Sequence, residues 1–245
     1  MTLRVENIVG GYSQVPVLKD VSFDVNDGEL VGLIGLNGAG KSTTINHIIG
    51  LLTPFKGRIS IDGTSIMDDA EKYKAQIAYI PETPILYDEL TLKEHLELTI
   101  TAYGLNSDAA WAKANHLLNI FRLDNKLEWF PANFSKGMKQ KVMITCAFMT
   151  DAKLFIVDEP FYGLDPIAVH DLLLEIEKVK AAGAAVLMST HVLDTAEKYC
   201  DKFVLLADGQ VKADGTLDEL RALSHGENQT LDDIYLALAK ENENE

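Results

Sequence analysis

Hydrophobic and polar positions along this chain follow two periods, one typical of strands and one typical of helices. Apolar residues alternate with polar ones at 3–5 and at 21–25, which predicts β structure within residues 1–28. The pair Gly10-Gly11 and the segment 26–28 carry turn residues, so Tyr12 is expected on a loop. By its residue type alone, Tyr12 is a packing aromatic more often than a ligand contact.

From residue 29 onward the pattern is that of an α/β chain. It predicts strands at 29–34, 57–62 and 77–80, a helix at 42–52 and a loop at 82–90. It resumes after residue 153 with strands at 154–157 and 184–189, helices at 167–182 and 192–200, and a hairpin at 203–206 and 210–213.

The segment between these two α/β parts is helical throughout. Thr91 followed by Glu94 is a capping box that starts the first predicted helix. Further helices are predicted at 107–121 and 133–150, so residues about 83–150 form a helical insert.

Composition narrows the class of protein. The chain has 245 residues, 47% hydrophobic and 24% charged, which fits one large or two modest globular domains. No apolar run has the length of a membrane-spanning helix and the start lacks the blocks of a signal peptide, so we expect a cytosolic protein. The net charge of −15 disfavours a nucleic-acid-binding surface. Cys146 and Cys200 lack metal-ligand spacing and are expected to be buried or half-buried thiols.

A phosphate-binding motif lies between the strand at 29–34 and the helix that follows it. Gly35–Thr43 matches G-x-x-x-x-G-K-[ST], and its glycines let the backbone come close to a ligand. The residues expected around the ATP phosphates are Gly35, Leu36, Asn37, Gly38, Ala39, Gly40, Lys41, Ser42 and Thr43. We expect Lys41 to reach the β- and γ-phosphates and the Ser42 hydroxyl to bind Mg²⁺. The alternative is a glycine-rich turn that merely precedes Lys-Ser.

Two carboxylates and a histidine follow other predicted strands. The strand at 154–157 runs into Asp158 and Glu159, and buried carboxylates are costly without a cation or hydrogen-bond donors. We expect Asp158 to hold Mg²⁺ indirectly and Glu159 to orient and deprotonate a water molecule. The alternative is a turn with solvated acids. His191 follows the strand at 184–189, at the sheet edge where ligands bind, which favours function over a structural role.

The segment Phe134–Gln140, FSKGMKQ, separates this chain from other phosphate-loop proteins. It resembles the signature, usually LSGGQ, of the nucleotide-binding subunits of ABC transporters, and the resemblance covers residues 3 to about 216. It implies an ABC ATPase domain over 1–216 with an α/β P-loop NTPase fold. That fold has a RecA-like mixed sheet core, an N-terminal antiparallel β subdomain and the inserted helical subdomain. Residues 217–245 then form a helical and acidic C-terminal extension, expected to fray at its charged end, 240–245.

The resemblance also assigns roles and partners. Tyr12 matches the aromatic that stacks on adenine, Asp165 matches the D-loop, and His191 matches the switch histidine at the γ-phosphate. The signature residues, which would serve the ATP of a partner subunit, are Ser135, Lys136, Gly137 and Met138. Two subunits, as a homodimer or heterodimer, would sandwich two ATP–Mg²⁺ head to tail. They would drive a separate integral membrane subunit from the cytoplasmic face of the cell membrane, with no nucleic acid involved.

Three positions depart from the family pattern. Glu82 stands where Gln is usual, and we expect it to remain a Mg²⁺ ligand with altered coupling. Lys136 and Met138 stand where Gly and Gln are usual, and Lys136 either strengthens closure on the partner's ATP or is simply solvated. Gly163 replaces a small hydroxyl residue or Ala, with little expected consequence.

The motifs YIPE at 79–82 and FSKGMKQKV at 134–142 narrow the resemblance. They are similar to single-domain bacterial exporter ATPases of the Ecs type and the bacitracin-resistance type, the Ecs type above all. This implies export. Two other functions stay open at this point: a soluble ABC ATPase of a cofactor-assembly or other non-transport complex, and a small-molecule phosphoryl transferase, against which the signature argues.

Overall fold

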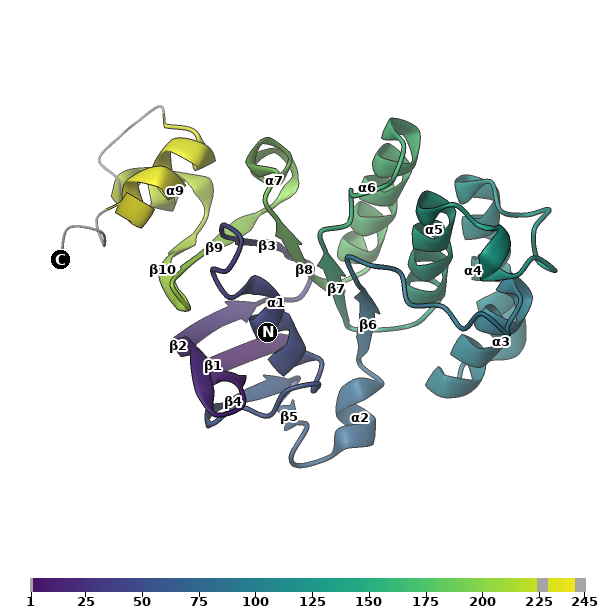
Figure 1. Cartoon of the computed structure of the whole chain (residues 1–245), viewed down its shortest axis with the longest axis horizontal. Coiled ribbons are helices and arrows are strands. Elements are labelled where there is room, and N and C mark those ends of the chain that lie inside the picture. The colour runs from purple at the N-terminus through teal and green to yellow at the C-terminus, as the bar shows by residue number, and fades with distance from the viewer. Residues whose placement is uncertain (1, 224–228, 241–245) are drawn as a thin grey trace.

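The molecule consists of two β-sheets with helices between and beside them (Figure 1). A computed structural model describes residues 2–223 and 229–240, so residues 241–245 of the predicted charged end, 240–245, lie outside the described residues. The strands are β1 Leu3–Tyr12, β2 Val15–Val25, β3 Leu30–Ile34, β4 Lys56–Ile61, β5 Thr64–Ser65, β6 Ile77–Ile80, β7 Leu154–Asp158, β8 Ala185–Thr190, β9 Lys202–Ala207 and β10 Gln210–Gly215. The helices are α1 Lys41–Ile48, α2 Ala70–Lys74, α3 Leu92–Tyr103, α4 Ser107–Phe121, the 3₁₀ turn η1 Pro131–Asn133, α5 Lys136–Phe148, α6 Pro166–Ala181, α7 Leu193–Tyr199, α8 Leu217–Leu223 and α9 Leu231–Lys240.

The sheets confirm the predicted fold class. The N-terminal sheet is antiparallel with the order β2-β1-β4-β5, and the second sheet has the order β10-β9-β3-β8-β7-β6. In the second sheet β10 pairs with β9 antiparallel, and all other neighbours are parallel. The carboxyl ends of β3, β7 and β8 therefore meet at one edge, where ligands bind in parallel sheets.

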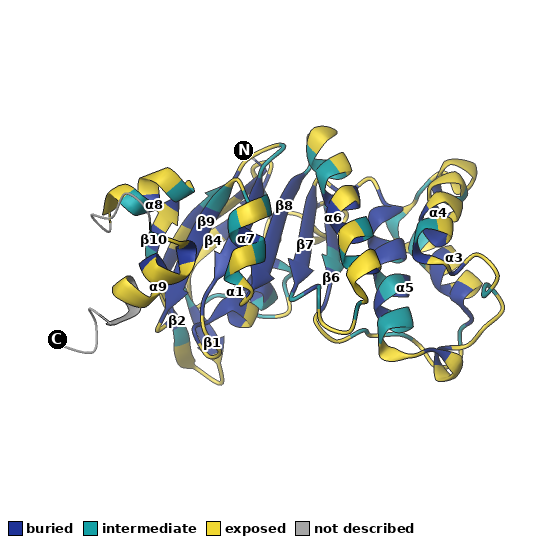
Figure 2. Cartoon of the chain, turned by 90° about the horizontal axis from the view of Figure 1, so that it is seen from above, coloured by how far each residue is buried: buried dark blue, intermediate teal, exposed yellow. Residues whose placement is uncertain are grey.

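Strand β7 shows why the central strands are continuous apolar runs. Leu154 and Ile156 face a core shared with α1 and the N-terminal sheet, whereas Phe155 and Val157 face the helical insert. Because side chains alternate between the two faces of a strand, a strand covered on both sides must be apolar at every position. Figure 2 shows these strands as buried along their whole length.

The helical insert, α3 to α5, lies at one end of the molecule (Figure 1). The predicted capping box is present, since the Thr91 hydroxyl accepts from the Glu94 N–H and the Glu94 carboxylate accepts from the Thr91 N–H. The helix predicted at 133–150 starts later, at Lys136, because Ser135 is its N-cap.

One turn prediction is wrong. Gly10 and Gly11 lie within β1, and Tyr12 ends that strand instead of lying on a loop. A Cβ on Gly10 would lie 2.2 Å from Nε2 of His47, so this glycine makes room for a helix side chain. The turn follows at Ser13 and Gln14, whose φ angles are 48° and 67°. Local sequence cannot distinguish a turn glycine from one required by long-range packing.

Helices α8 and α9 pack on the other end of the second sheet (Figure 2). Leu220, Leu231 and Ile234 share a buried cluster with Phe203 and Leu205 of β9. Over the described ranges, 2–223 and 229–240, the helices are all too short or too polar to cross a membrane. Both cysteines are free and half-buried, as expected.

Candidate active site

A cavity of about 600 Å³ opens at the carboxyl edge of the second sheet. It is lined by Tyr12, Val17, Leu36, Asn37, Gly38, Gly40, Lys41, Ser42, Thr43, Glu82, Glu159, Tyr162 and His191. Most of the residues predicted for the site therefore surround one space. Gly35, Ala39 and Asp158 are described by the structure but are not among the residues that line this cavity. Val17 and Tyr162 were not predicted.

The glycines of the phosphate loop serve two different needs. Gly38 and Gly40 have φ angles of 85° and 111°, which L side chains rarely adopt. Gly35 is needed for space instead, because a Cβ there would lie 2.6 Å from the carbonyl oxygen of Leu206. Gly40 caps α1, so the loop leads into a helix N-terminus, where the helix dipole favours an anion.

Lys41 is buried and held by the site itself. Its Nζ donates to the carbonyl oxygen of Gly35 at 2.6 Å and lies 3.7 Å from Oε1 of Glu159. Only 7% of the side chain is exposed. The ammonium thus stands between the phosphate loop and a carboxylate, where an incoming phosphate can replace both partners.

Ser189 organises the two carboxylates at the end of β7. The Ser189 hydroxyl, on β8, donates to Oδ1 of Asp158, its register partner on β7, and accepts from the backbone N–H of Glu159 at 3.1 Å. Sequence reasoning missed Ser189; the available signal was a hydroxyl residue at the end of an apolar strand, two positions before His191. Glu159 has a φ of 45°, which is uncommon outside glycine and typical of strained functional positions.

His191 contacts Glu159, as its position at the end of β8 suggests. Nδ1 of His191 lies 2.8 Å from Oε2 of Glu159, and the backbone N–H of His191 donates to the same oxygen at 3.3 Å. Glu159 is therefore flanked by Lys41 on one oxygen and His191 on the other. This arrangement holds the Glu159 carboxylate beside Lys41 of the phosphate-binding loop.

The electrostatics at Asp158 suit a divalent cation. Burial raises the pKa of Asp158 above its usual value, and repulsion from Glu159 and Glu82 adds to the rise, although Ser189 and Lys41 oppose it. Burial also raises the pKa of Tyr79, with Asp158 and Glu82 contributing. Within 2–223 and 229–240, no three His, Cys, Asp or Glu side chains gather closely enough to hold a metal ion by themselves. The groups available to a Mg²⁺ ion here would be the Ser42 hydroxyl, these carboxylates and the phosphate oxygens of the nucleotide.

Tyr12 lines the same cavity as Glu82 and Glu159. The side chain of Asn46 donates to the Tyr12 hydroxyl at 3.3 Å, and 49% of Tyr12 is exposed. A half-exposed ring at the mouth of a phosphate site is available for stacking on a nucleotide base.

The signature residues are placed differently from the rest. All four belong to the described part of the chain, and none of them lines the cavity. The Ser135 hydroxyl caps α5 by accepting from the Met138 N–H at 3.3 Å. A Cβ on Gly137 would lie 2.4 Å from the carbonyl oxygen of Gly163, so the start of α5 packs directly on the D-loop segment.

Lys136 is exposed, and its charged end contacts an aromatic ring. Its Nζ lies 3.7 Å above the ring of Tyr162, a cation–π contact, and its aliphatic stem passes over Gly163. Gly163 has a φ of 86°, which L side chains rarely adopt, so a residue with a Cβ would be strained at this position. Since Tyr162 lines the cavity, Lys136 is one side chain away from the nucleotide site.

Two further contacts join the signature helix to the site. Asp165 caps α6 by accepting from the Ala168 N–H, and it forms an ion pair with Lys141 of α5 at 3.0 Å. The hydrogen bond from Ala168 lowers the pKa of Asp165 most, and the contact with Lys141 lowers it further. The buried Gln140 donates to the carbonyl oxygen of Pro81 at 3.1 Å, directly before Glu82. The helix that carries the signature is thereby fastened to both the D-loop and Glu82.

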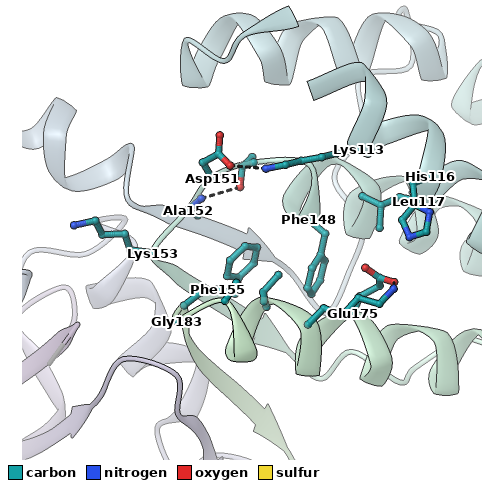
Figure 3. A pocket seen from close by; sticks show the side chains of 15 residues that line it. Lys113, His116, Leu117, Phe148, Asp151, Ala152, Lys153, Phe155, Glu175 and Gly183 are labelled. Atoms are coloured by element: carbon teal, nitrogen blue, oxygen red, sulfur yellow. Dashed lines mark hydrogen bonds and ion pairs between the residues drawn. The ribbon is translucent and has the colours of Figure 1, made fainter. Parts of the chain in front are cut away.

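A second cavity of about 500 Å³ lies between α4, α5 and α6, near the start of β7 (Figure 3). Phe148 and Phe155 form part of its apolar wall, and Lys113 pairs with Asp151 at its rim. The residues that line it include none of the predicted site residues. It is therefore distinct from the candidate active site.

Comparisons with known proteins agree with the geometry. The profile of the ABC transporter family matches residues 18–162. The ABC-type transporter ATP-binding protein EcsA of Bacillus subtilis is 56% identical over 239 residues, covering 98% of this chain and 97% of that protein. The Nod factor export ATP-binding protein I of Rhizobium meliloti is 33% identical and covers 88% of this chain and 64% of that protein.

A solved structure described as the ATP-binding subunit of an ABC transporter has a TM-score of 0.95 and 55% identity, covering 97% of this chain and 99% of the other. Family profile, sequence and fold thus lead to the same group. The chain belongs to the ABC transporter family, as an ATP-binding subunit that acts as an ATPase coupled to transport.

Proposed function

We propose that this subunit binds a second nucleotide-binding subunit head to tail around two ATP–Mg²⁺ and drives a separate membrane subunit in export. The observation that carries this proposal is the placement of the signature. Ser135 and Gly137 stand at the N-terminus of α5, an anion-binding position, but outside the cavity of their own chain. If each ATP site is completed by the signature of another subunit, the phosphate loop and the signature of one chain need not lie at the same cavity.

The residues around Glu159 support a hydrolytic mechanism. Lys41 contacts Gly35 and Glu159, and His191 contacts Glu159. A γ-phosphate in the loop draws Lys41 away, which frees one oxygen of Glu159 to accept a proton from water. That water attacks the γ-phosphorus while the bond to the bridging oxygen of ADP breaks. His191 keeps Glu159 in place and contacts the γ-phosphate.

Mg²⁺ fits the donor set around Asp158. We propose that the Ser42 hydroxyl and the Glu82 carboxylate ligate the ion and that Asp158 holds it indirectly. The ion neutralises charge on the phosphate oxygens. The raised pKa of Asp158 supports this assignment, because a cation would relieve the repulsion among the three carboxylates.

We further propose that residues 1–216 form the ATPase domain and that the insert, about 83–150, contacts the membrane subunit. Its coupling to the site rests on the contacts of Gln140 with Pro81 and of Lys141 with Asp165. A rotation of the insert must therefore move Glu82 and the D-loop as well. A relative named for export supports the export direction, and a membrane partner places this subunit at the cytoplasmic face.

Replacement of Glu159 by Gln tests this proposal. The variant retains the Lys41 and Ser42 phosphate contacts but lacks the base, so ATP should trap it as a dimer in light scattering after gel filtration. Lys41→Ala in the same background should prevent the dimer, because it removes the phosphate contact. A Glu159→Gln chain that binds ATP and stays monomeric would contradict the proposed homodimer.

A further inference from the structure

The C-terminal extension reaches the phosphate loop through one side chain. Tyr235 of α9 is 4% exposed, and its hydroxyl accepts from the backbone N–H of Leu36 at 2.9 Å. The same hydroxyl donates to the carbonyl oxygen of Leu206 at 3.2 Å. It therefore joins the second residue of the phosphate loop to the neighbouring strand β9.

Tyr235 is held in this position by a packed cluster. Ile34, at the end of β3 and directly before the loop, lies in the same buried cluster as Tyr235, Ile234 and Leu231. Gly35 approaches the carbonyl of Leu206 so closely that a Cβ would lie 2.6 Å from it. The start of the phosphate loop thus packs closely on β9 and is hydrogen-bonded to α9.

The extension also contacts the segment that carries His191. The backbone N–H of Leu231 donates to Oε2 of Glu197 in α7 at 2.8 Å, and Glu197 forms an ion pair with Arg221 of α8 at 3.5 Å. A cavity of about 450 Å³ lies between the segment His191–Asp194 and the start of α9 at Thr230 and Asp232. Helix α9 is therefore adjacent to both the phosphate loop and the switch histidine.

We infer that Tyr235 is a positioning residue for ATP binding, through which the C-terminal extension holds the phosphate loop in its binding conformation. It lies outside the residues that line the nucleotide cavity, so it acts through the backbone of Leu36. A loop already held in place loses less conformational entropy when the nucleotide binds. This inference depends on ATP binding by a single chain and not on the proposed dimer.

The test compares Tyr235→Phe with Tyr103→Phe. Tyr103, in α3 of the helical insert, is the control, because its hydroxyl also donates to a backbone carbonyl, that of Ile77 in β6. Tyr235→Phe should raise the Kd for ATP, measured by calorimetry without turnover, by roughly three- to tenfold, the loss expected for one hydrogen bond. Tyr103→Phe, which removes one hydrogen bond where Tyr235→Phe removes two, should lower thermal stability but leave the Kd for ATP unchanged.

Amide hydrogen exchange supplies a readout that a purely structural role would not move. In the nucleotide-free wild type the Leu36 amide should be protected, and Tyr235→Phe should accelerate its exchange roughly tenfold while Tyr103→Phe should not. An unchanged Kd in Tyr235→Phe, or an unprotected Leu36 amide in the wild type, would overturn the inference. The exchange rate of the Leu36 amide in the wild type tests the inference even if Tyr235→Phe folds poorly.

Discussion

Ser189 gives the most specific prediction about the site. Its hydroxyl is fully buried and donates to a carboxylate that has been removed from water, so Ser189→Ala leaves Asp158 without this donor. A hydrogen bond to a charged group contributes about 1.5–3 kcal/mol, and we expect that loss in the free energy of unfolding at neutral pH. We also expect the Mg²⁺ concentration for half-maximal ATPase activity to rise, since protonation of Asp158 becomes easier.

The loss should depend on pH in a defined direction. The folded-state pKa of Asp158 is already raised above 3.8, so ionisation of Asp158 destabilises the fold. That penalty is absent below the unfolded-state pKa and is complete above the folded-state pKa. Ser189→Ala raises the folded-state pKa further, because the hydroxyl lowers it in the wild type. The difference from the wild type should therefore grow as the pH rises through this window.

Thr190 provides the control for this prediction. It is equally buried on the same strand, but its hydroxyl accepts from a neutral group, the Val192 N–H, at 3.0 Å. Thr190→Val should cost about 0.5–1.5 kcal/mol at every pH. Urea unfolding between about pH 4 and pH 8 distinguishes the two variants. A Ser189→Ala loss that is independent of pH and equal to that of Thr190→Val would refute the assignment.

Three other substitutions test separate parts of the account. Glu82→Gln should raise the Mg²⁺ concentration needed for ATPase activity, because a neutral amide replaces one of three clustered carboxylates that attract the cation, and an unchanged Mg²⁺ titration would count against a metal-ligand role. Lys136→Met keeps the stem but loses the cation over Tyr162, and should weaken ATP-dependent dimerisation without changing ATP binding by the monomer; equal dimerisation would assign Lys136 no role there. Gly10→Ala should destabilise the fold by about 1–3 kcal/mol in thermal or urea unfolding, because its Cβ would overlap the ring of His47, and a stability equal to that of the wild type would show that the ring moves freely.

Features encoded by neighbouring residues could be predicted from the sequence. The capping box at Thr91, the hairpin of β9 and β10 and the phosphate loop depend on residues a few positions apart. Strand ends could be predicted as well, so Glu159 and His191 were expected at one sheet edge, where they are now seen in contact.

Features that depend on distant residues could not be predicted in this way. The contact between Tyr235 and Leu36 joins positions 199 residues apart, and no local pattern indicates it. The contact of Lys136 with Tyr162 and the space that Gly10 leaves for His47 likewise exist only after folding. Ser189 was missed because a single serine at a strand end carries no motif.

The central claim is that each ATP site combines the phosphate loop of one subunit with the signature of another. Mixing two inactive variants, Lys41→Ala and Ser135→Arg, tests this claim most directly. Each variant alone has only defective sites, but a mixed dimer has one site with an intact loop and an intact signature. The ATPase rate of an equimolar mixture should recover to roughly a quarter of the wild-type rate, because half of random dimers are mixed and each has one intact site of two. A mixture no more active than its components, although mixed dimers form, would contradict the claim.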